Sequence, residues 1–95
     1  MKTKSELEIK EYAKENSKTI VIRSYDNGGS IDTVRKSTKK ESTIIEAVLF
    51  GALCAINNGS DIQSCKDTAE YTGDQLLPNV NGYDTFYRRI EAGLK

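Results

Sequence analysis

Four cations lie within six residues near the middle of the chain, at Arg35, Lys36, Lys39 and Lys40. The free amides at the start of a helix, together with lysine and arginine side chains, form sites for phosphate and other anions. This run is therefore a candidate site for a nucleotide or a nucleic-acid backbone, whose affinity would fall as salt rises. Because no glycine-rich cradle accompanies it, the run also fits a solvated charged turn.

A second cluster, near the end of the chain, mixes aromatic and cationic side chains at Tyr83, Tyr87, Arg88 and Arg89. Tyrosine and arginine are common anchors of protein interfaces. Aromatic rings beside cations also hold the bases of single-stranded nucleic acid. A third interpretation places Phe86 in the core and the tyrosines over its edge. We take the cluster as the candidate partner-binding face.

Residues suited to catalysis or metal binding are sparse. Histidine is absent, which removes the usual general base near neutral pH and histidine-ligated metals. Cys54 and Cys65 cannot complete a four-ligand zinc site by themselves, and a catalytic thiol needs an activating neighbour. Glu46 would be an acid or base if burial raised its pKa, but it also fits a residue that complements a helix dipole. The aspartates fit turns and helix starts: Asp26, Asp32, Asp61, Asp67 and Asp74. We predict no catalytic residue, no metal and no cofactor.

Charge is balanced overall but not along the chain. Fourteen basic residues match fourteen acidic ones in a chain of 95 residues, which argues against a purely electrostatic nucleic-acid binder. Residues 1–41 carry ten basic and seven acidic side chains, whereas residues 42–95 carry four and seven. The two halves therefore differ in sign, and they could dock head to tail. With no secretory or membrane-spanning run, we expect a cytoplasmic protein with free thiols.

The first half predicts a β-hairpin. Residues 19–25 are β-branched and aromatic, residues 30–36 alternate, and Asn27-Gly28 between them suits a tight turn. The segment before the hairpin is ambiguous. In residues 5–15, Leu7 and Ile9 alternate as in a strand, whereas the charges suit a solvated helix. We favour the strand, which would make a three-stranded meander.

The second half predicts helices. A capping box at Thr38–Glu41 or Thr43–Glu46 precedes an apolar run over residues 44–56. A helix that is apolar nearly all round needs cover on two sides, so we expect the sheet on one side and the last helix or a second subunit on the other. A homodimer is therefore expected. Gly59 ends this helix, a short helix follows over residues 60–71 and stops near Gly73, residues 74–82 form a loop, and residues 83–92 form the last helix.

The sequence thus predicts one α+β domain over residues 1–95. It has a small antiparallel sheet of two or three strands packed on a long apolar central helix, followed by two shorter helices. For function we expect a non-catalytic protein-binding module, such as the small inhibitors or adaptors of host proteins that phages and mobile elements encode. It would use the face around residues 83–89 or the edge of the sheet. The alternative is nucleotide or nucleic-acid binding through residues 35–40 and the C-terminal helix. We expect no membrane partner.

Overall fold

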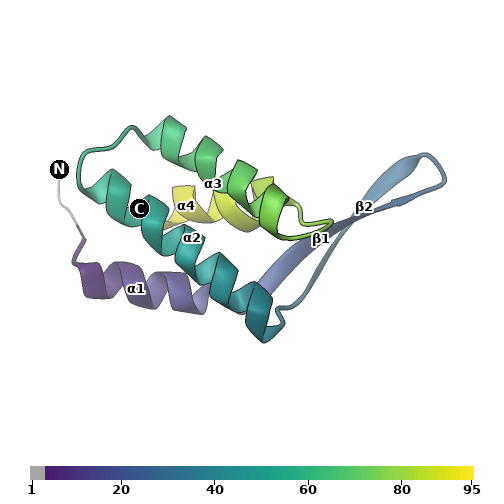
Figure 1. The fold of residues 1–95 in the computed structure, drawn as a ribbon, viewed down its shortest axis with the longest axis horizontal. Coiled ribbons are helices and arrows are strands. Elements are labelled where there is room, and N and C mark those ends of the chain that lie inside the picture. Colours follow the sequence, from purple (N-terminus) through teal and green to yellow (C-terminus); the bar gives the residue numbers. More distant parts are fainter. Residues whose placement is uncertain (1–3) are drawn as a thin grey trace.

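The structure is a computed structural model that describes residues 4–95; the basic start of the chain at residues 1–3 lies outside the described part. The chain has an α+β fold, as predicted. Three helices form one layer, the C-terminal helical segment packs behind that layer, and a β-hairpin extends from one end (Figure 1). The elements in chain order are α1 (Glu6–Glu15), β1 (Thr19–Asp26), β2 (Gly29–Lys36), α2 (Lys39–Asn57), α3 (Ile62–Leu76), a π-helical segment η1 (Tyr83–Tyr87) and α4 (Arg88–Gly93).

The strand predicted for residues 5–15 is wrong, because this segment is helix α1. Ser5 begins it with a capping box, in which the Ser5 hydroxyl accepts from the Glu8 amide and the Glu8 carboxylate accepts from the Ser5 amide. The side chains that pack inward are Ile9 and Ala13, which lie four residues apart, whereas Leu7 is 65% exposed. Leu7 and Ile9 therefore do not share one buried face, as they would in a half-buried strand. The sheet has two strands and not three.

The predicted hairpin is confirmed and is slightly longer than expected. β1 and β2 pair antiparallel from Thr19 opposite Lys36 to Asp26 opposite Gly29. Asn27 and Gly28 both have positive φ, at 46° and 82°, which is the geometry that lets a two-residue turn follow the twist of the strands. All eight residues of β2 are exposed, and the hairpin points away from the helices (Figure 1).

Only the first half of β1 joins the body of the protein. Ile20 and Val21 are buried, and the chain after α3 runs along the other edge of the strand. The Arg23 amide donates to the Asn79 carbonyl at 2.7 Å, and the Asn81 amide donates to the Val21 carbonyl at 2.8 Å. These bonds satisfy backbone groups that an edge strand would otherwise leave to water.

Helix α2 begins at the first of the two predicted capping boxes. The Thr38 hydroxyl accepts from the Glu41 amide, and the Glu41 carboxylate accepts from the Thr38 amide. Its inward side chains join one core with residues from α1, β1, α3, η1 and α4. Helices α1 and α3 flank α2 on its two sides. The sheet contributes mainly Ile20 to the core around α2, so it covers less of this helix than we expected. The four fully inward residues of α2 are Ile45, Leu49, Leu53 and Ile56.

The boundaries of α3 correct two predictions. The N-cap is Asp61, whose carboxylate accepts from the Ser64 amide at 2.8 Å, so the helix begins at Ile62 and not at residue 60. The helix also continues through Gly73 to Leu76. The absence of a side chain at Gly73 allows the ring of Phe86 to pack directly against α3, since a Cβ at this position would lie 2.0 Å from that ring. By contrast, Gly59 ends α2 with φ 101°, as predicted.

The last predicted helix is confirmed over residues 83–93, although its first turn is a π-turn. The Arg88 amide donates to the Tyr83 carbonyl, five residues earlier, which widens the helix locally. Phe86 and Ile90 are fully buried and anchor this segment behind α2 and α3. Within residues 4–95, no helix is both long enough and apolar enough to cross a membrane.

Candidate functional site

The basic turn at residues 35–40 is partly neutralised by the chain itself. The Arg35 guanidinium makes two hydrogen bonds of 2.8 Å to the carboxylate of Glu41, which also caps helix α2. A carboxylate therefore already occupies the place where a phosphate would meet the first amides of the helix. Lys36, Lys39 and Lys40 are exposed, and within residues 4–95 none of their ammonium groups makes a hydrogen bond or ion pair.

The Arg35–Glu41 pair predicts a specific loss of stability in acid. Hydrogen bonds from Arg35, and next from the Thr38 amide, lower the pKa of Glu41 from 4.5 to about 2. The depressed pKa means that this contribution to stability is present above pH 4.5 and is lost as the pH falls toward 2. We expect Glu41→Gln, which can still cap the helix, to cost about 1 kcal/mol at pH 7 and to lose less stability than the wild type between pH 4.5 and 2.5.

Urea unfolding at several pH values measures this effect. Glu15→Gln is the matched control, because its ion pair with Lys18 is exposed on both sides, at 71% and 61%, and should contribute less than about 0.5 kcal/mol. Parallel acid profiles for the wild type and Glu41→Gln would contradict the assignment.

The four side chains of the C-terminal cluster differ in exposure, since Tyr83 and Arg88 are exposed whereas Tyr87 and Arg89 are half-buried. Tyr83 and Tyr87 stack with ring centroids 4.9 Å apart and planes 20° apart. The Tyr87 hydroxyl lies 2.6 Å from the amide nitrogen of Gln63, which holds its ring against α3. Tyr83 is 45% exposed, and the Arg88 side chain is 67% exposed with only a 3.8 Å ion pair to Asp84. Tyr83 and Arg88 are therefore exposed, and the half-buried Tyr87 lies between them and α3.

Arg89 does not join these exposed side chains. Its guanidinium donates at 2.7 Å to the carbonyls of Asn16 and Thr19 and at 3.1 Å to the Thr19 hydroxyl, so it ties α4 to the connection between α1 and β1. Burial lowers the pKa of Arg89. Tyr12 also donates a hydrogen bond from its hydroxyl to the Arg89 carbonyl. Arg89 therefore has a structural role within the chain, and its contact with a partner stays a prediction.

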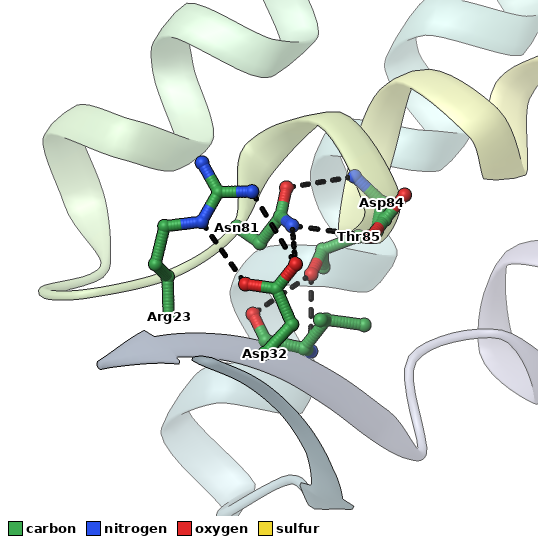
Figure 2. Close-up of polar contacts among 6 residues, drawn as sticks. Arg23, Asp32, Asn81, Asp84 and Thr85 are labelled. Atoms are coloured by element: carbon green, nitrogen blue, oxygen red, sulfur yellow. Dashed lines mark hydrogen bonds and ion pairs between the residues drawn. The ribbon is translucent and has the colours of Figure 1, made fainter. Parts of the chain in front are cut away.

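A polar network joins the base of the hairpin to η1 (Figure 2). The guanidinium of Arg23 donates to both carboxylate oxygens of Asp32 on the facing strand, at 3.0 and 3.3 Å. The side-chain Nδ2 of Asn81 donates to the carboxylates of Asp32, at 3.0 Å, and Asp84, at 3.1 Å. The fully buried Thr85 hydroxyl bonds both the amide and the carbonyl of Val21. Asp32 is thus part of a cross-strand network, where the sequence indicated a turn residue.

Beside this network lies a polar cleft of about 280 Å³ between the hairpin, α3 and the start of η1. Tyr25 and Tyr83 line it, and they are 78% and 45% exposed. Glu70 and Asp74, from one face of α3, supply carboxylates that make no hydrogen bond or ion pair within residues 4–95. We call these four residues the tyrosine cleft. Rings and carboxylates together attract a cation, because both present negative potential to it.

Sequence reasoning missed most of the tyrosine cleft. Its members lie on three elements far apart in the chain. Tyr25 and Glu70 fit ordinary positions of a strand and a helix, and Asp74 fitted a turn. The local signal was the turn chemistry of residues 79–82, where Asn79 has φ 60°. A Cβ at Gly82 would lie 2.5 Å from the Asp74 carboxylate, so this glycine allows the loop to approach α3.

The remaining candidate groups show no catalytic arrangement. Cys54 and Cys65 are partly buried free thiols, and burial raises the pKa of Cys54, which disfavours its reactive thiolate form. Glu46 lies partly buried on α2. Among the residues that the structure describes, no three of the cysteine and carboxylate side chains gather as metal ligands.

Comparison of the chain with models of known protein families, with curated proteins and with solved structures finds no significant match.

Proposed function

We propose that this chain is a non-catalytic protein-binding module whose binding face surrounds the tyrosine cleft. The observation that carries the proposal is the meeting of two exposed tyrosines with two unpaired carboxylates in one cleft at the base of the hairpin. Tyrosine supplies a large contact area at low entropic cost, and it is common among residues that dominate binding energy. An inhibitor or adaptor of another protein needs no more than such a face.

The chemistry of the cleft also indicates what part of the partner enters it. Arg23 is already neutralised by Asp32, so the charge left over in the cleft is negative, from Glu70 and Asp74. A lysine or arginine side chain of the partner would pair with these carboxylates and pass between the rings of Tyr25 and Tyr83. We therefore propose a partner that presents a basic residue from a loop or an extended segment. We further propose that the module works in the cytoplasm, where its two thiols stay reduced, and as a homodimer.

Photo-crosslinking in the native host tests the binding face. A photoreactive phenylalanine at position 25 or 83 should crosslink the same partner protein. The same probe at position 71 should not, because Tyr71 is equally open, at 66% exposed, but does not line the cleft. With the purified partner, Tyr83→Ala and Glu70→Gln should each weaken binding about tenfold or more, whereas Tyr71→Ala should leave it unchanged. Equal crosslinking at 71 and 83, or unchanged affinity in both cleft variants, would exclude this face.

The nucleotide or nucleic-acid alternative has less support. It would depend on Lys36, Lys39 and Lys40 alone, because Arg35 and the start of α2 are engaged by Glu41. Its signature would be affinity for an oligonucleotide that falls steeply with salt and that is lost in a Lys39→Ala, Lys40→Ala double variant.

A further inference from the structure

Gly51, in the middle of helix α2, has no explanation within the chain. A glycine inside a helix costs about 1 kcal/mol relative to alanine. The two other helical glycines are explained by close packing, since a Cβ at Gly73 in α3 or at Gly93, the last residue of α4, would collide with the ring of Phe86 or Tyr12. A Cβ at Gly51 would meet nothing within 4 Å. Among the residues that the structure describes, none approaches this position, so its lack of a side chain fits contact with another molecule.

The surface around Gly51 has a shape that could accommodate a helix of another molecule. Gly51 lies in a groove of about 480 Å³ between α2 and α3, on the opposite face of α3 from the tyrosine cleft. Most side chains along the groove are small, Val48 being the largest apolar one, which lets the backbone of another helix approach closely. The small residues include Ala47, Gly51 and Ala55 on α2 and Ser64, Thr68 and Thr72 on α3. This is an unpartnered groove with low walls, not an enclosed ligand pocket.

The charges at the two ends of this layer have opposite sign. Helix α1 runs antiparallel to α2, because Lys4 bonds Asn57 at one end and Ser17 lies 3.1 Å from Ser42 at the other. The start of α2 therefore carries Lys39 and Lys40, with Lys14 near the end of α1, whereas the far end of α2 lies beside Glu6 and Asp61. The acidic residues of α3 at the basic end, Glu70 and Asp74, belong to its other face.

Gly51 lies close to the midpoint between these ends. Lys40 precedes it by 11 positions and Asp61 follows it by 10. A second copy related by a twofold axis through Gly51 would therefore place its acidic end against the basic end of the first copy. By symmetry, its basic end would meet the acidic end of the first copy. Such an arrangement satisfies both pairs of charges in one closed, self-complementary contact.

We propose that the groove between α2 and α3 is the contact surface for a second copy of this chain, with the two α2 helices crossing antiparallel at Gly51. This inference specifies the contact of the homodimer proposed above. It leaves the tyrosine cleft outside the contact, so a dimer could present two clefts to partners.

Sedimentation equilibrium of the full chain tests the contact. We expect a dimer at roughly 10 µM for the wild type and a monomer for Gly51→Leu, whose dimer dissociation constant should rise at least about 100-fold. The leucine side chain would fill the crossing point between the two helices, whereas its high helix propensity should keep α2 folded. Ala47→Arg provides a second variant in the groove. The matched control is Ala92→Leu, a small-to-large change at an exposed position of α4, which should remain dimeric. Circular dichroism and urea unfolding establish that each variant is folded.

Charge provides an independent readout of the same contact. Lys40→Glu places like charges at both junctions and should weaken the dimer, less so at high salt. A monomeric wild type at 100 µM, or dimers that persist unchanged in folded Gly51→Leu and Ala47→Arg, would overturn the proposal. Because crosslinking from position 83 does not depend on the groove, its retention in monomeric Gly51→Leu would show that the partner-binding proposal stands separately.

Discussion

Replacing Gly73 by alanine is expected to destabilise the protein by about 3 kcal/mol or more, although alanine is the better helix former. The new Cβ would lie 2.0 and 2.4 Å from two ring carbons of Phe86, and this ring is fully buried with 0% exposure. Either Phe86 leaves its position or α3 moves away from η1, and both changes disrupt the core. Urea unfolding followed by circular dichroism measures the loss.

Gly51→Ala is the matched control for this prediction. The substitution is the same, and both positions lie inside helices, but a Cβ at Gly51 meets nothing within 4 Å among residues 4–95. Measured on the monomer at low concentration, it should stabilise the fold by up to about 1 kcal/mol. If Gly73→Ala were as stable as the wild type, the close packing of Phe86 on α3 would be wrong.

Removal of the Arg89 side chain should have the second largest effect, a loss of about 2–3 kcal/mol for Arg89→Ala. The guanidinium bonds two carbonyls and one hydroxyl at the connection between α1 and β1, and its removal leaves these acceptors without their donors. Arg89→Lys should recover only part of the loss, because one ammonium group cannot reproduce the planar set of donors. Thermal and urea unfolding of the purified variants give the values.

The adjacent arginine supplies the comparison. Arg88→Ala should change stability by less than about 0.5 kcal/mol, because its side chain is 67% exposed and its ion pair with Asp84 is long, at 3.8 Å. Equal losses in Arg88→Ala and Arg89→Ala would mean that Arg89 is not the tie between α4 and β1. If Arg89→Ala lost partner binding with no change in stability, Arg89 would instead be a residue that contacts the partner.

Features specified by neighbouring residues were predictable. The hairpin follows from β-branched residues on either side of Asn27-Gly28, whose positive φ values require residues of this type. The start of α2 follows from Thr38 and Glu41, three residues apart, since a capping box needs no distant contact. The same motif at Ser5 and Glu8 was present in the sequence, but the alternation of Leu7 and Ile9 competed with it.

Tertiary contacts decided which local preference held. Residues 5–15 are helical because Ile9 and Ala13 pack into the core along one helical face. In the same way, α3 continues through Gly73 because Phe86, thirteen positions further along the chain, fills the space that glycine leaves. Glycine suits both a helix end and a close contact, and the local sequence does not distinguish between them.

The sequence by itself determined the α+β class, the hairpin and the central helix, because each depends on composition or on residues a few positions apart. Only the tertiary structure decided which charges remain available. It tied Arg89 to the carbonyls of Asn16 and Thr19 and paired Arg35 with Glu41. Among residues 4–95, it also left Glu70 and Asp74 without hydrogen-bond or ion-pair partners in the tyrosine cleft. Such a site forms when distant elements meet, and the energy that brings them together comes from burial of the shared core, not from the site residues.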